Sequence, residues 1–184
     1  DYFVVFDLST VPNAELYDFT APNVGDDDND SDATPGDPQD DMAASGQTGQ
    51  LNSGDEDLSL DAGVVCAISV EVANPFTICA TQKIDLLADA SVSPAVLGGV
   101  WTTPDGTGTF LDANGDEITA APYEFGVAAM YVPSAADAQR GSITLILTSG
   151  NPGDLSPTSS CTAVSNQVTI EILKVDCGAF FWNG

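Results

Sequence analysis

Hydrophobic residues recur along most of the 184-residue chain in short runs separated by turn residues. From residue 64 onward seven such runs predict strands, and two of them, SITLILT (142–148) and QVTIEIL (167–173), alternate between core-facing and solvent-facing positions. The other five are CAISVEVA (66–73), TQKIDLLADAS (81–91), GGVWTTP (98–104), GTGTFLD (106–112) and VAAMYVPS (127–134). Seven strands at this spacing predict an immunoglobulin-like β-sandwich over residues 64–176. We expect one helical turn inside it, from an N-cap at Ser134 to Gly141.

The N-terminal third of the chain predicts a second, smaller β-domain. The run DYFVVFDLS (1–9) is rich in aromatic and β-branched residues, which favours a strand buried on both faces. Further strands are predicted at AELYDFT (14–20) and in a hairpin of TGQL (48–51) with DLSLDAGVV (57–65), around Asn52-Ser53-Gly54. Residues 1–63 are therefore expected to form part of a β-domain, and the whole chain is expected to be all-β.

Charge narrows the choice of partners. The chain has 28 acidic and 3 basic residues, for a net charge of −25, and residues 1–82 contain no Lys or Arg. Such a field repels nucleic acids and anionic membranes and attracts cations. The sequence also has no apolar run of the length that a membrane-spanning helix needs. We therefore expect neither nucleic-acid binding nor membrane insertion.

Catalytic chemistry is poorly supported by the residue types. The chain has no His, so Ser-His-Asp and Cys-His arrangements are excluded. A pair of carboxylates for glycoside hydrolysis needs a deep cleft, which a narrow sandwich rarely offers. Trp101 fits a core position better than a sugar-stacking one. We expect a protein that is not an enzyme.

The four cysteines, Cys66, Cys79, Cys161 and Cys177, lack the C-x-x-C spacing of a zinc site. An even number of cysteines in a β-rich chain predicts two disulfides and an oxidising compartment, with four buried thiols as the alternative.

An acidic stretch, VGDDDNDSDATPGDPQDD (24–41), is the strongest candidate for metal binding. Asp26, Asp28, Asp30 and Asp32 alternate, so a locally extended chain would place their carboxylates on one side, where calcium prefers oxygen ligands. The alternative is a solvated acidic loop, because like charges repel. The stretch DANGDE (112–117) also has calcium-loop spacing, but Asn114-Gly115 favours a hairpin turn there.

Two parts of the chain resemble repeats of secreted bacterial surface proteins. DYFVVFD, GDDDNDSDA and TGQLNSGDEDLSLDAGVV resemble the second half of the B-type repeats of serine–aspartate-repeat adhesins, over residues 1–63. GGVWTTPDGTGTF, YVPSAADAQRGSITLILTS and SCTAVSNQVTIEI resemble an immunoglobulin-like or PKD-like repeat, over residues 66–175. CGAFFWNG (177–184) is similar to the start of a further B-type repeat, so we expect it to begin the next repeat or to act as a donated strand.

The resemblance implies a function and several residue roles. It implies a structural repeat of an extracellular cell-surface fibre, filament or giant adhesin, stiffened by disulfides and calcium and contacting neighbouring copies of itself, with strand donation as one route. The alternative is an extracellular module that binds a glycan or a host protein. The calcium ligands implied are Asp30 and Asp32, with Asp55 or Asp57 from the hairpin. The disulfides implied are Cys79–Cys161 and, from the remaining pair, Cys66–Cys177.

Overall fold

The chain is all-β and divides into two compact units. The computed structural model describes residues 3–22, 31–37, 40–47, 50–56, 60–157 and 159–174. The first unit comprises Asp1–Ala67 and Leu155–Cys161, and the second comprises Ile68–Asp154 and Thr162–Gly184. The sequence places a boundary at residue 63, close to the first of these junctions, but it does not predict that residues 155–161 return to the first unit.

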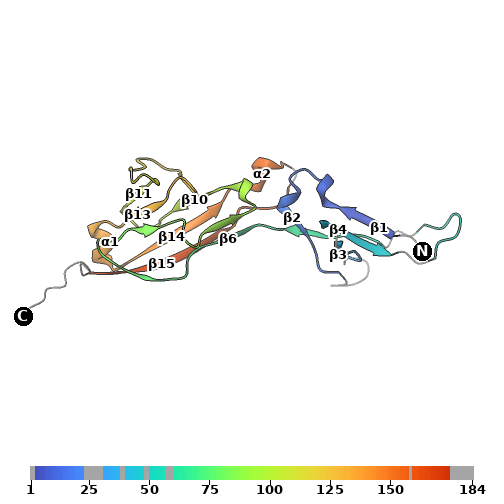
Figure 1. The fold of residues 1–184 in the computed structure, drawn as a ribbon, viewed down its shortest axis with the longest axis horizontal. Helices are drawn as coiled ribbons and strands as arrows, with labels where there is room; N and C mark the ends of the chain where they lie inside the picture. The colour runs from blue at the N-terminus through green and yellow to red at the C-terminus, as the bar shows by residue number, and fades with distance from the viewer. Residues whose placement is uncertain are drawn as a thin grey trace, which may run out of the picture. The chain divides into compact units, whose positions relative to one another are not determined.

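The first unit contains two small sheets (Figure 1). One has the strand order β1-β4-β3, formed by β1 (Phe3–Asp7), β4 (Asp40–Gln47) and β3 (Thr34–Asp37). The other pairs β2 (Tyr17–Phe19) with β5 (Val64–Cys66) in antiparallel register, and two 3-10 turns, Leu8–Thr10 and Ala14–Leu16, join β1 to β2. The predicted turn at Asn52-Ser53-Gly54 is present, with Asp55 N–H donating to the Asn52 carbonyl and Gly54 at φ +96°. The predicted pairing of its arms rests largely on residues 48–49 and 57–59, which lie outside the described residues, and Val64 and Val65 at the end of the second arm pair with β2.

The strand β1 differs from its prediction. A strand buried on both faces was expected, but Val5 is 58% exposed and Asp7 is also exposed, whereas Val4 and Phe6 are half-buried. The reason is its place at the outside of a three-stranded sheet with one packed face. The buried core on that face is small and consists of Leu8, Ala14, Phe19, Ala33 and Ala44, with Phe6, Tyr17 and Ala62 beside it.

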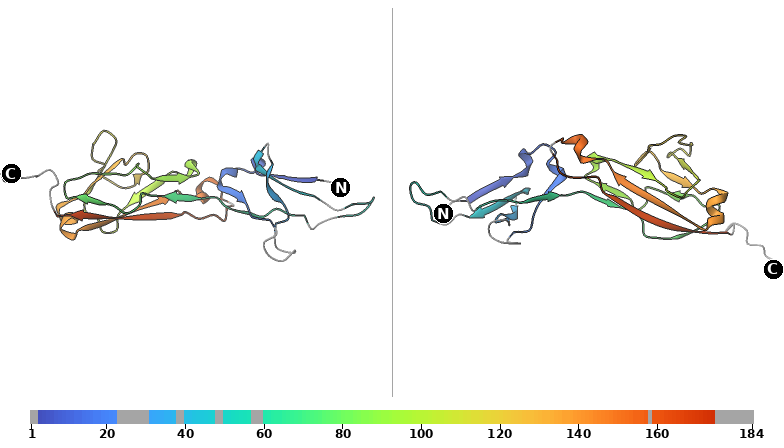
Figure 2. Two further views of the ribbon diagram at one scale, coloured as in Figure 1. Left: turned by 60° about the horizontal axis from the view of Figure 1, so that its bottom comes forward. Right: turned by 180° about the vertical axis from the view of Figure 1, so that it is seen from behind.

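The second unit is a sandwich of one large sheet and two small ones. The large sheet has the order β12-β10-β14-β15-β7, and the small sheets are β11-β13-β8 and β6-β9. Its elements are β6 (Ser69–Glu71), β7 (Thr77–Cys79), β8 (Ile84–Asp85), β9 (Ser91–Ser93), η3 (Ala95–Leu97), β10 (Gly99–Thr102), β11 (Thr109–Leu111), β12 (Tyr123–Glu124), β13 (Met130–Val132), α1 (Ala135–Arg140), β14 (Ser142–Ser149), α2 (Pro152–Leu155) and β15 (Ser165–Leu173). The long strands β14 and β15 lie side by side in every view (Figure 2), and β7 pairs with β15 in parallel.

The alternating pattern of β14 and β15 is confirmed. Ile143, Leu145 and Leu147 on β14 and Val168, Ile170 and Ile172 on β15 are all at most 4% exposed and form the centre of the sandwich core. Trp101 on β10 packs in the same core at 2% exposure, as the core interpretation predicts. The strands β7 and β12 have no counterpart among the predicted runs, and β9 shares only Ser91 with one of them.

Candidate functional site

The described disulfide joins Cys66 to Cys161, which overturns both predicted pairings. The two Cα atoms are 5.7 Å apart and the cysteines are separated by 95 residues. Cys66 ends β5, opposite Tyr17 of β2. Cys161 ends the returning segment 155–161, which the Asn13 side chain also holds through a 3.0 Å hydrogen bond to the Leu155 carbonyl. The predicted Cys79–Cys161 pairing assumed that Cys161 belongs to the sandwich, whereas the chain leaves the sandwich after residue 154.

Cys79, at the end of β7, is also disulfide-bonded. The sequence contains four cysteines, and the bond between Cys66 and Cys161 uses two of them. Cys177 is the remaining cysteine, and it lies outside the described residues.

Most of the predicted calcium ligands fall outside the described residues. Asp26, Asp28, Asp30 and Asp57 lie outside them, and Asp32 and Asp55 lie within. Across the described ranges, no group of three or more His, Cys, Asp or Glu side chains could hold a metal ion. Asp32 and Asp55 do not by themselves make a calcium site, so calcium binding stays a prediction.

Asp55 has a local structural role. Its Oδ2 accepts hydrogen bonds from the backbone and side-chain nitrogens of Asn52, at 2.8 and 3.1 Å. The backbone hydrogen bond from Asn52, followed by the side-chain one, lowers the pKa of Asp55 below its usual value. The carboxylate therefore closes the turn at residues 52–55.

The DANGDE stretch is the turn that the sequence favours. Asp112 Oδ1 accepts the N–H groups of Asn114 and Asp116 at 2.8 and 2.9 Å, and Gly115 has φ +87°. The backbone hydrogen bond from Asp116 is the main cause that lowers the pKa of Asp112. This carboxylate organises its own loop.

A buried carboxylate network at α1 is the most developed polar cluster in the described residues. Asp137 is fully buried and accepts hydrogen bonds from the backbone nitrogens of Thr107 and Ser134 at 2.9 Å each and from Tyr131 Oη at 3.0 Å. Thr107 Oγ1 and Arg140 Nη1 lie at 3.1 and 3.3 Å from its Oδ1. Ser134 and Asp137 also form a reciprocal capping box, so the predicted N-cap at Ser134 and end at Gly141 are confirmed.

The network shifts two pKa values in opposite directions. Burial raises the pKa of Asp137, but the hydrogen bonds from Ser134, Thr107 and Tyr131 outweigh it, so the pKa lies below its usual value. Burial first, and the neighbouring carboxylate of Asp137 as well, raise the pKa of the Tyr131 hydroxyl. Asp137 therefore stays charged and Tyr131 stays neutral at pH 7. A lone Asp in a helix of this length gives little signal in the sequence, although the S-x-x-D spacing resembles a capping box.

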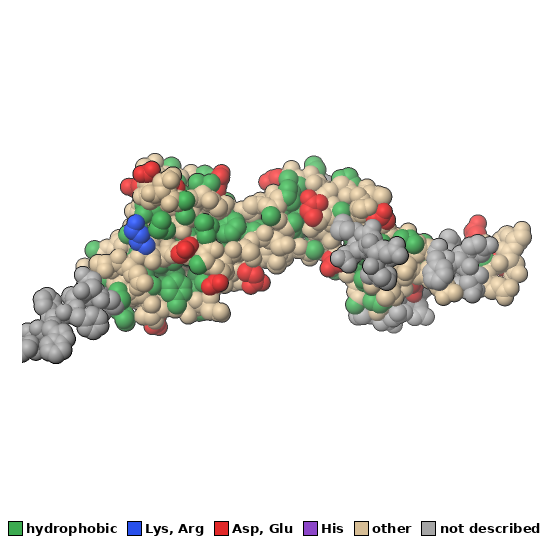
Figure 3. Space-filling model, viewed as in Figure 1, with side chains coloured by type: hydrophobic (Ala, Val, Ile, Leu, Met, Phe, Trp, Pro, Cys, Tyr) green, Lys and Arg blue, Asp and Glu red, His purple; other side chains and the backbone are tan. Residues whose placement is uncertain are grey.

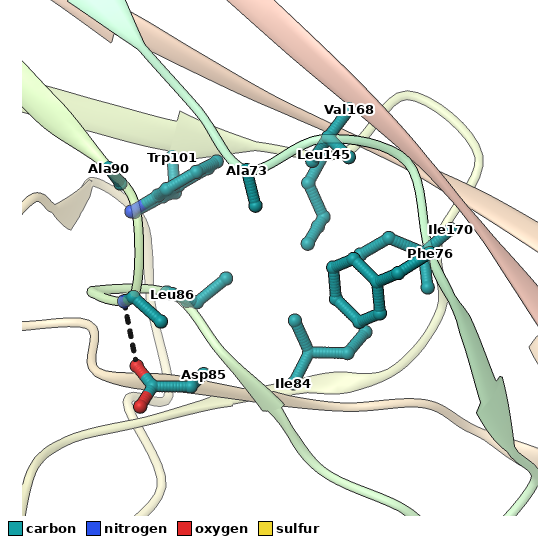
Figure 4. A pocket seen from close by; sticks show the side chains of 11 residues that line it. Ala73, Phe76, Ile84, Asp85, Leu86, Ala90, Trp101, Leu145, Val168 and Ile170 are labelled. Carbon is teal, nitrogen blue, oxygen red and sulfur yellow. Dashed lines mark hydrogen bonds between the residues drawn. The ribbon is translucent and has the colours of Figure 1, made fainter.

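A groove beside β7 is the best candidate for ligand binding. Residues 73–78, 82–85 and 88–89 enclose about 460 Å³, with Asn74, Phe76, Gln82, Lys83 and Asp89 in the lining. It adjoins a small apolar cavity of about 10 Å³ lined by Phe76, Trp101 and Leu86 (Figure 4). Phe76 is 38% exposed, and its carbonyl accepts the Glu171 N–H at 3.0 Å, which fixes it against β15. The Trp101 indole N–H has no acceptor among the described residues.

Acidic side chains are scattered over the visible surface, with one small basic group (Figure 3). No helix in the described part of the chain is long and apolar enough to cross a membrane. No protein-family model matches the chain, and no curated protein matches it either. The resemblance to bacterial surface repeats therefore stays a prediction from the sequence.

Proposed function

We propose that this chain is a structural repeat of an extracellular bacterial fibre, filament or giant adhesin on the cell surface. The observation that supports this most directly is the Cys66–Cys161 disulfide. Disulfides persist in oxidising surroundings outside the cytoplasm, which fits a cell-surface location. The two β-rich units fit the tandem-repeat resemblance of the sequence.

The position of the disulfide suits a chain under tension. A force applied to both ends passes along the backbone to Cys66, crosses to Cys161 and continues toward the C-terminus. Residues 67–160, which include every strand from β6 to β14, lie outside this covalent path. At about 3.3–3.6 Å per extended residue, the 95-residue separation means that the bond keeps about 310–340 Å of chain from extending. Such a limit on extension suits a load-bearing repeat.

The proposal also includes calcium binding and contact between neighbouring copies of the chain. The alternating carboxylates Asp26, Asp28, Asp30 and Asp32 are proposed to bind calcium, together with Asp55 or Asp57. Binding to the folded state alone raises stability, so added calcium is expected to raise the melting temperature of the first unit. An unchanged midpoint in millimolar calcium, against magnesium as the control, would remove calcium from the proposal.

Electron microscopy of the native material tests the proposed function. We expect filaments with a regular repeat built from this chain. Pulling a single oxidised molecule from both ends should extend it by about 310–340 Å less than the same molecule after reduction. A native protein that is always monomeric, or equal extension before and after reduction, contradicts a load-bearing role.

A binding module is the second candidate, and the groove beside β7 is the observation that favours it. Exposed Phe76 offers an apolar ring next to polar groups of Asn74 and Lys83, an arrangement that suits a sugar or a peptide of a host protein. Screening against glycans and extracellular host proteins tests this. Binding that is lost in Phe76→Ala but kept in Leu87→Ala, an exposed apolar residue outside this groove, supports the second candidate.

A further inference from the structure

The outer edge of β1 has no strand beside it in the described part of the chain. β1 lies at one end of the order β1-β4-β3, and its five residues pair with β4 from Phe3↔Gln47 to Asp7↔Ala43. Among the described residues, no strand pairs with the backbone N–H and C=O groups on its other side. Unpaired strand edges are templates for another strand.

Three other sheet edges, those of β3, β7 and β12, have features that discourage pairing. At the far side of the same sheet, β3 contains Pro35 and a register shift between Pro35 and Asp37. In the sandwich, β7 is three residues long and follows Pro75, and β12 is two residues long and ends at Glu124. Proline, bulges, charge and short length are the usual means by which proteins protect an edge.

β1 has none of these protections along its first four residues. Its sequence is FVVFD, without proline or charge before Asp7, and its ladder with β4 is regular. Val5 is 58% exposed, so the strand also presents an apolar side chain to solvent. An edge that is regular, apolar and exposed is suited to strand addition.

We propose that the edge of β1 is an acceptor site for residues 178–184 of a second copy of this chain. This inference rests on the proposed fibre function and names the contact between successive copies. The donated segment, GAFFWNG, would extend the sheet to the order donor-β1-β4-β3, with its aromatic side chains covering Val5. Because donor and acceptor are different surfaces, the contact is heterologous and repeats head to tail.

Charge and aromatic content favour residues 178–184 as the segment that pairs with β1. The chain carries a net charge of −25, and residues 1–82 hold no basic residue, so acidic segments of a second copy would be repelled from β1. Residues 178–184 contain no acid and place Phe180, Phe181 and Trp182 in succession. Their length is sufficient to pair with the five residues of β1. Pairing of β1 with the β1 of a second copy would instead bring Asp1 and Asp7 of both chains together.

Two complementary variants test the contact. Val5→Lys places a charge beneath the donated aromatic residues at a position that is already exposed, and a chain that lacks residues 178–184 removes the donor. Unmodified protein is expected to form assemblies that grow with concentration in light scattering. Each variant alone is expected to remain at the monomer mass of about 18.9 kDa. An equimolar mixture is expected to form a dimer, because the truncated chain accepts the tail of Val5→Lys.

The outcomes separate this contact from its alternatives. Val96→Lys is the matched control, because Val96 is 53% exposed in the sandwich and the charge change is the same; it is expected to assemble like the unmodified protein. Self-association of the truncated chain would overturn the proposal in favour of β1–β1 pairing. A mixture that stays monomeric, or an unmodified protein that never assembles, also overturns it. Filaments that survive both changes would leave the fibre function standing and refute only this contact.

Discussion

Replacing Asp137 by Ala is expected to destabilise the sandwich strongly, because Asp137 satisfies donors from four neighbouring residues. The side chain is 0% exposed, and Thr107 N, Ser134 N and Tyr131 Oη all lie within 3.0 Å of its carboxylate oxygens. An unsatisfied buried donor costs about 1–3 kcal/mol, so three give roughly 3–9 kcal/mol. These losses are not additive, and water can reach the exposed Thr107 side, so we expect about 3–5 kcal/mol, the range for breaking a buried charge network.

Urea unfolding measures this loss. In a Trp182→Phe background Trp101 is the sole remaining tryptophan, and its buried position in the core reports on the sandwich alone. With a slope of about 2 kcal/mol per molar urea, the midpoint should fall by about 1.5–2.5 M. Asp154→Asn, which removes one exposed carboxylate, is the control and should stay within about 0.5 kcal/mol of the parent. A loss below about 1 kcal/mol in Asp137→Ala would refute the role assigned to the network.

Three further predictions follow from the same contacts. The pKa of Asp137 is lower in the folded than in the unfolded protein. The Asp137 carboxylate therefore stabilises the folded state at pH values above the unfolded pKa near 3.8, and this stabilisation disappears as the pH falls through the folded pKa. The urea midpoints of the parent and of Asp137→Asn should therefore converge in acid and stay apart from pH 5 to 8. The paired change Cys66→Ser with Cys161→Ser should cost about 4–5 kcal/mol for a loop of 95 residues, measured by urea unfolding without reductant. Gly108→Ala should lower the melting temperature, because a Cβ there would overlap the Val132 carbonyl oxygen. Gly153→Ala is the packing control and should not lower the melting temperature, because an added Cβ there meets no atom closer than 3.4 Å and the residue has no positive φ.

The sequence predicted the sandwich best where one strand face is buried along many residues. In β14 and β15 each inward position is apolar, and the structure places these positions in the core. The two-residue strand β12 is extended because it pairs with β10, and the local sequence pattern does not predict that pairing. The strands β3 and β4 lie in and after a stretch treated as an acidic loop, because their Gly, Pro and Asp residues favour turns.

The disulfides show a different limit of sequence reasoning. Four cysteines predict two bonds, but the connectivity depends on which segments meet in space. The return of residues 155–161 to the first unit is held by the Asn13–Leu155 hydrogen bond and by the Cys66–Cys161 bond, and neither Asn13 nor Leu155 has a distinctive local pattern. Likewise, the buried role of Asp137 depends on Thr107, thirty residues earlier in the chain.

The discrepancy at β1 has a physical interpretation in the proposed assembly. The composition FVVF predicts a strand with both faces covered, whereas the single chain leaves Val5 58% exposed at a sheet edge. A strand that a second copy covers in the assembly should have the residue types of a protein interior, and it should be exposed in the isolated chain. β3, at the opposite edge of the same sheet, combines Pro35 with a register shift, so the sheet can grow in one direction. One protected and one open edge are what a head-to-tail polymer requires, because growth at both edges would give branched or unordered aggregates.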